Sequence, residues 1–225
     1  MGLCLYLAYA IQTYGLERTT SSKNAFLTAV YCVLVPFFHW ACSRQRPDRY
    51  NILAAVLCVA GVGLVSLNGD LSINIGDLLT LLCAVFYALH IVVTAKVSPG
   101  RDIALLTVFQ FAFAALFAWA GGVLTEEFPA AALARPETAL PLLYLGVMAT
   151  TVALLFQNVG QVNSDPSSAA VILSLESVFG VLCSVVFYGD AVTGRLLAGF
   201  GLIFLAVLCS ETKFSFLRPK QPPKG

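Results

Sequence analysis

One carboxylic acid stands in the middle of an apolar stretch of this chain. Glu176 lies nine positions into the segment 167–188, which is mostly apolar. An acidic side chain at the centre of a membrane helix costs about 2.5–3.5 kcal/mol, so it must face the bundle interior or water, or be protonated. Glu176 could therefore contact a polar solute or carry a proton. The alternative is a neutral glutamic acid that locks helices together by hydrogen bonds.

Uncharged amides form a second group of candidates. Gln157 and Asn158 are adjacent, Gln161 lies one helical turn further on, and Gln12 stands 145 positions before Gln157. Amides donate and accept hydrogen bonds without charge, which suits a polar solute in a partly dry cavity. The alternative for Gln12 and Gln157 is hydrogen bonding between helices, worth less than about 2 kcal/mol each. Gln161 is interpreted as structural, near the water boundary.

Four further polar residues complete the candidate binding set. Tyr31 stands 145 positions before Glu176, Tyr87 and His90 share a helical face, and Gln110 lies in the next apolar segment. His90 could titrate near neutral pH. A lone histidine in a helix can equally be a neutral, hydrogen-bonded group.

The sequence argues against an enzyme, a metal site and a nucleic-acid surface. No HExxH motif, no glycine-flanked serine paired with a histidine and no GxxxxGK[ST] loop is present. The seven cysteines lie in or beside apolar segments without a CxxC pair, and the net charge is only +1. We therefore expect no catalytic residues, no cofactor, no direct use of ATP and no nucleic-acid partner.

The composition is typical of an integral membrane protein. The chain is 59% hydrophobic and 11% charged, against roughly 45–50% and about 25% in soluble domains. A membrane helix needs about 20 mainly apolar residues. The pattern predicts a bundle of eight transmembrane helices, over residues 1–16, 24–42, 51–68, 76–95, 103–124, 139–160, 167–188 and 193–211.

The chain contains an internal sequence repeat. Residues 12–65 align without gaps on residues 157–210, so helices one to three match helices six to eight. A shift of five helices reverses direction through the bilayer, which is typical of a transporter built from inverted repeats. We expect an ancestral design of ten helices, five plus five, of which this chain lacks the first two. A misplaced start, a truncated gene or a second chain that supplies the gap would each explain this.

The repeat divides the chain into three parts. Residues 1–68 are the remainder of the first repeat, with three helices, and residues 76–211 are the second repeat, with five. Residues 212–225 form a basic tail.

Basic residues are distributed unequally between the two expected sides of the membrane. With the amino end in the cytoplasm, nine basic residues lie on that side: Arg44, Arg46, Arg49, Lys96, Arg101, Lys213, Arg218, Lys220 and Lys224. Four lie on the other: Arg18, Lys23, Arg135 and Arg195. The positive-inside rule therefore predicts that both termini are cytoplasmic.

Four stretches resemble the drug/metabolite transporter superfamily, and specifically its EamA-type permeases. Asp190 stands where that family usually has Glu, and Ser177 where it usually has Pro. The stretches are GDLLTLLCAVFYALHIVVTAK (76–96), FQNVGQ (156–161) with SSAAVILSLESVFG (167–180), YGDAVTGRLLAG (188–199) and AFLTAVYCVLVP (25–36).

The resemblance implies a multi-pass permease, typically of the bacterial inner membrane, that moves a small metabolite, amino acid or drug by alternating access. The expected partners are a small-molecule solute and the lipid bilayer. A homodimer, or a chain that supplies the missing helices, is a further possibility. The alternative function is a truncated, transport-inactive subunit with a structural or regulatory role.

Overall fold

The computed structural model describes residues 1–43, 46–66, 73–125, 135–163 and 166–212. Residues 213–225 of the basic tail lie outside these residues. The helices are α1 (Gly2–Leu16), α2 (Ser21–Thr28), α3 (Val30–Ser43), α4 (Arg49–Ser66), α5 (Ile75–Val97), α6 (Ile103–Thr125), α8 (Pro136–Tyr144), η1 (Leu145–Val152), α9 (Ala153–Asn163), α10 (Pro166–Cys183), η2 (Ser184–Tyr188) and α11 (Gly194–Thr212).

Each of the eight predicted segments corresponds to helical residues. Five helical stretches are long and apolar enough to cross a membrane: 21–42, 49–66, 75–97, 103–124 and 136–160. Shorter apolar helices cover 175–188 and 194–210, and α1 has 15 residues. The prediction of an all-α membrane bundle is confirmed. Side chains of α8 and η1 are not buried within the chain, which is expected where an apolar helix faces lipid.

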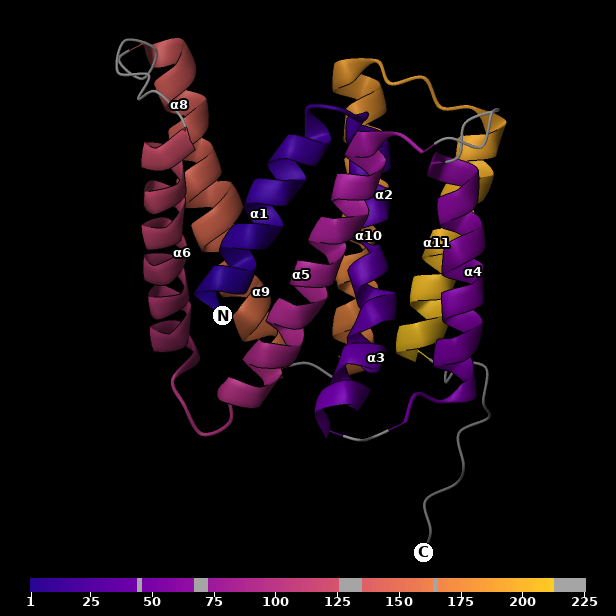
Figure 1. The fold of residues 1–225 in the computed structure, drawn as a ribbon, viewed down its shortest axis with the longest axis horizontal. Helices are drawn as coiled ribbons and strands as arrows, with labels where there is room; N and C mark the ends of the chain where they lie inside the picture. Colours follow the sequence, from indigo (N-terminus) through magenta and orange to yellow (C-terminus); the bar gives the residue numbers. More distant parts are fainter. Residues whose placement is uncertain (44–45, 67–72, 126–134, 164–165, 213–225) are drawn as a thin grey trace, which may run out of the picture.

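Successive membrane segments cross the bundle in alternating directions (Figure 1). Segments that are 145 positions apart in the sequence therefore run in opposite directions: α1 against α9, α3 against α10, and α4 against α11. The last pair also packs together closely. The direction of the matched helices is the one that the sequence repeat predicts.

Two features of the helices were not foreseen. The predicted helix 24–42 is interrupted at Ala29, where the N–H of Cys32 bonds the Ala29 carbonyl at 3.1 Å in a tighter turn. Pro36 lies within α3. In addition, η1 and η2 are π-helical. The Thr151 hydroxyl donates to the Gly146 carbonyl five residues back, at 2.8 Å, within η1.

A glycine contact joins the matched helices α4 and α11. A Cβ atom added to Gly61 would lie 2.9 Å from the Gly199 carbonyl oxygen, and one added to Gly199 would lie 3.0 Å from that of Gly61. Small residues are favoured where membrane helices approach this closely. Gly201, two residues further along α11, has open space around it.

We expect Gly61→Ala to destabilise the bundle by about 1–3 kcal/mol, because the added methyl group overpacks a backbone contact. Thermal unfolding of the purified protein in detergent measures the effect. Gly201→Ala is the matched control and should change the midpoint little. Equal effects of the two substitutions would contradict the packing argument.

Candidate functional site

Three tyrosines from three helices meet in the bundle. Tyr87 of α5 lies edge-on to Tyr9 of α1, with ring centroids 5.9 Å apart and planes at 71°. It also lies 6.0 Å from Tyr31 of α3, with planes at 47°. We call Tyr9, Tyr31 and Tyr87 the tyrosine cluster. Tyr87 is near the centre of the 23-residue helix α5, so the cluster lies near the middle of the membrane span.

Gln12 connects the tyrosine cluster to α2. Its carbonyl oxygen accepts a hydrogen bond of 2.7 Å from the Tyr87 hydroxyl. Its amide nitrogen donates to the Asn24 Oδ1 atom at 3.3 Å and to the Thr28 Oγ1 atom at 3.1 Å. The amide is therefore oriented by partners on two other helices, with its acceptor directed toward the tyrosines.

The acidic candidate, Glu176, lies on α10. Its carboxylate lies within electrostatic range of the hydroxyls of Tyr9 and Tyr87. The residue is exposed on the surface of this chain and is not packed in its core. The structure thus brings together four of the predicted site residues, Gln12, Tyr31, Tyr87 and Glu176, and adds Tyr9. An acid, an amide and aromatic rings at one depth can contact both the charged and the apolar parts of a small solute.

The remaining predicted residues have other partners. His90 Nε2 of α5 lies 2.9 Å from Gln110 Oε1 of α6, and both residues are buried. The buried amide of Asn158 donates to Thr107 Oγ1 at 3.0 Å, which links α9 to α6. These bonds are of the kind that holds membrane helices together. Gln157 is half-buried on α9. The side chain of Gln161 is not among those that the structure describes.

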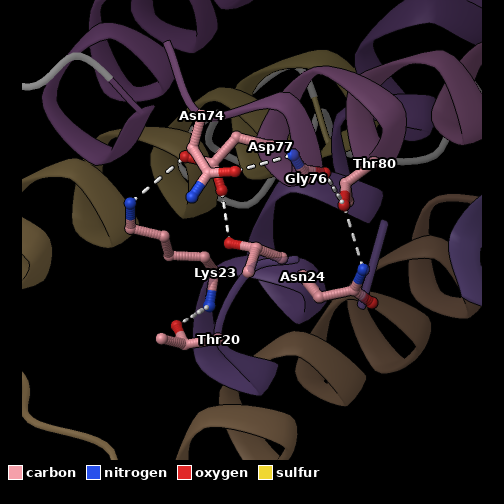
Figure 2. Close-up of polar contacts among 8 residues, drawn as sticks. Thr20, Lys23, Asn24, Asn74, Gly76, Asp77 and Thr80 are labelled. Carbon is pink, nitrogen blue, oxygen red and sulfur yellow. Dashed lines mark hydrogen bonds and ion pairs between the residues drawn. The ribbon is translucent and has the colours of Figure 1, made fainter. Parts of the chain in front are cut away.

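An ion pair joins the start of α2 to the start of α5. Lys23 Nζ lies 3.1 Å from Oδ2 of Asp77, whose side chain is fully buried, and the Thr19 hydroxyl donates to the other carboxylate oxygen. Figure 2 shows Lys23 extending from α2 toward Asp77. Each helix begins with a side-chain cap: Thr20 accepts from the Lys23 N–H, and Asn74 accepts from the Gly76 N–H at 2.7 Å. A carboxylate in the first turn of α5 also suits the positive end of the helix dipole.

A second carboxylate holds the same end of α2. Asp190, in the turn between η2 and α11, accepts hydrogen bonds from the Ser22 N–H at 3.0 Å and from the Ser22 hydroxyl at 2.8 Å. The Ser184 hydroxyl donates to the same oxygen. Burial raises the pKa of the Asp190 carboxyl, but these hydrogen bonds to its charged form outweigh burial and leave the pKa below its ordinary value. Ser22, Lys23, Asp77 and Asp190 together form what we call the end clamp.

Hydrogen bonds connect the end clamp to the tyrosine cluster. The Asn24 amide, which accepts from Gln12, donates to Thr80 Oγ1 at 3.0 Å. The Thr80 hydroxyl in turn bonds the Gly76 carbonyl at 2.8 Å, next to Asp77 (Figure 2). A short chain of polar contacts thus connects Gln12 to the start of α5.

The lowered pKa of Asp190 gives a prediction for stability against pH. A group whose pKa is lower in the folded state stabilises the fold above its unfolded pKa, 3.8 for Asp, and that contribution is lost as the pH falls through the lower folded value. We expect the melting temperature of the native protein to fall more steeply than that of Asp190→Asn between about pH 5 and pH 3. Parallel curves for the two proteins would contradict the assignment.

Two segments of the chain, residues 2–67 and 74–212, match the model of the EamA-like transporter family. The chain belongs to this family. An uncharacterized transporter of Archaeoglobus fulgidus is 35% identical over 92% of this chain, and the uncharacterized transporter YvbV of Bacillus subtilis is 27% identical over 94%. A second uncharacterized transporter of A. fulgidus is 26% identical over 77% of the chain. The resemblance drawn from the sequence is therefore confirmed.

The chain spans about two thirds of the length of these relatives: 66%, 70% and 61% respectively. A protein of known crystal structure superposes on 94% of this chain and 73% of its own length, with a TM-score of 0.62 and 20% identity. That likeness concerns the fold alone. As an EamA-like family member with long apolar helices, the chain is a membrane protein.

Proposed function

We propose that this protein is a secondary transporter that moves a small polar or amphipathic solute across a membrane by alternating access. The observation that carries this proposal is the convergence of Glu176, Gln12 and the tyrosine cluster at mid-helix depth in an EamA-like bundle. Transporters of inverted repeats bind their solutes near the bilayer midplane, between the repeats. In this chain the tyrosines and Gln12 come from helices α1, α3 and α5, and Glu176 comes from α10.

In this proposal the end clamp is the gate on one side of the site. Lys23 and Ser22 of α2 contact Asp77 and Asp190 of the other repeat, so these bonds must separate when that side opens. The polar chain through Asn24 and Thr80 couples the clamp to Gln12. We infer that a solute that displaces Tyr87 from Gln12 weakens the clamp and favours opening.

The unequal distribution of basic residues supports an orientation with both termini in the cytoplasm and the end clamp on the non-cytoplasmic side. Coupling to protons or to an exchanged solute is part of the same proposal and depends on Glu176. The alternative proposal is a membrane subunit with a structural or regulatory role.

Counterflow exchange in proteoliposomes tests the function. Vesicles with the purified chain are loaded with a panel of amines, amino acids and nucleosides, and uptake of the same labelled compounds is followed. We expect exchange of at least one compound, and loss of that exchange in Gln12→Leu. No exchange of any compound by a folded chain would favour the inactive subunit. Exchange that is unchanged in Gln12→Leu would contradict the proposed site.

A further inference from the structure

Away from their ends, the membrane-spanning helices carry almost no charged side chains. Outside the first and last turns of the described helices, Glu176 is the one Asp, Glu, Lys or Arg. The basic residues Lys23, Arg49, Lys96 and Arg195 all lie at helix ends. Away from their ends, the described helices therefore contribute one acidic side chain and no Lys or Arg. Electrostatic attraction is strong in such a low-dielectric environment, and so is repulsion of anions.

The tyrosine cluster adds to this preference. The face of an aromatic ring carries negative potential and attracts cations within about 6 Å of its centroid. The rings of Tyr9 and Tyr31 are inclined to that of Tyr87 by 71° and 47°, so their faces point in different directions and are not stacked in one column. Before a solute binds, the bond from the Tyr87 hydroxyl to Gln12 holds the central ring in place. Glu176 lies within electrostatic range of Tyr9 and Tyr87.

We propose that the site selects a small organic cation, an amine or quaternary ammonium compound, whose positive group pairs with Glu176 and lies against the faces of Tyr9 and Tyr87. Gln12 then bonds a polar group of the same solute. Carboxylates and phosphates are rejected because no Lys or Arg outside the end turns of these helices offsets the charge of Glu176. This inference rests on the proposed function, since it names the solute class of that site.

Binding of two isosteric probes tests the proposal. Choline and 3,3-dimethyl-1-butanol have nearly the same shape, but only choline is charged. We expect the detergent-purified chain to bind choline at least about tenfold more tightly than the neutral alcohol, as measured by calorimetry and by the ligand-induced shift in melting temperature. The anion 3,3-dimethylbutanoate should bind more weakly than either.

Substitutions at Glu176 and in the tyrosine cluster test whether choline binds there. Glu176→Gln and Tyr87→Leu should each weaken choline binding by about tenfold or more, whereas Tyr87→Phe keeps the ring and should retain most of it. Tyr144→Leu, at an exposed tyrosine outside the cluster, is the control and should bind choline like the native protein. Melting curves without ligand show whether each variant is folded. If Tyr87→Leu does not fold, the single variants Glu176→Gln and Tyr87→Phe provide the test.

Equal affinity for choline and the alcohol, preference for the anion, or unchanged binding in Glu176→Gln would overturn the inference. So would the absence of binding for choline, tetraethylammonium and benzylamine at roughly 10 mM, well above the concentration at which a weak millimolar site fills. Cation binding without exchange in vesicles would uphold the solute class and contradict transport. Exchange of neutral or anionic solutes without cation binding would uphold transport and contradict the solute class.

Discussion

Lys23→Met is expected to lower the free energy of unfolding by about 3–5 kcal/mol, because it leaves the buried carboxylate of Asp77 without the cation that it pairs with. The Asp77 side chain has no exposed surface, whereas 18% of the Lys23 side chain is exposed. The lysine can therefore reach water when the pair separates, but the carboxylate cannot. Denaturant unfolding of the purified protein in detergent measures the loss.

Two controls make this prediction specific. Asp77→Asn in the Lys23→Met background removes the buried charge and should restore most of the lost stability. Arg18→Met breaks the exposed ion pair between Arg18 and Glu17, and should cost less than about 1 kcal/mol. If the double variant is as unstable as Lys23→Met, the ion pair is not what holds α2 to α5.

Glu176→Leu should lower the rate of solute exchange by about 100-fold or more. The variant should be as stable as the native protein or more stable. A charge near the centre of a membrane helix costs about 2.5–3.5 kcal/mol, which the apolar side chain does not incur. Exchange falls because the solute loses its charged contact in the site. The two alternatives for Glu176 therefore predict opposite changes in stability, since a glutamic acid that locks helices would destabilise the bundle when removed.

Unfolding in detergent and counterflow in vesicles are measured on the same preparation. Glu137→Leu, at an exposed acid in the first turn of α8, is the matched control and should leave exchange unchanged. A less stable Glu176→Leu variant that still exchanges solute would support the helix lock and count against the site.

The positions of the helices could be predicted from the sequence because apolar length and polar bends determine them directly. The repeat spacing also related Gln12 to Gln157 and Tyr31 to Glu176, and the structure places Gln12, Tyr31 and Glu176 around one centre. Hydropathy does not give the rotation of a helix about its axis. Tyr9 therefore had no signal that set it apart from other aromatic residues.

The end clamp was missed for a related reason. Asp77, Lys23 and Asp190 lie at helix ends, where charged residues are ordinary, so only the three-dimensional contacts single them out. The break at Ala29 lies next to Thr28, which accepts a hydrogen bond from Gln12 of another helix. No Pro or Gly stands at that point of the sequence, so the helix was predicted as continuous.

The central claim is that a transported solute occupies the space beside Glu176. A hydrophobic carbodiimide modifies carboxylic acids within membranes, and mass spectrometry gives the fraction of Glu176 that has reacted with time. A solute that the chain exchanges should slow this reaction by about tenfold when it saturates the site. If Glu176 reacts at the same rate whether or not exchange is saturated, the solute binds elsewhere and the account is wrong.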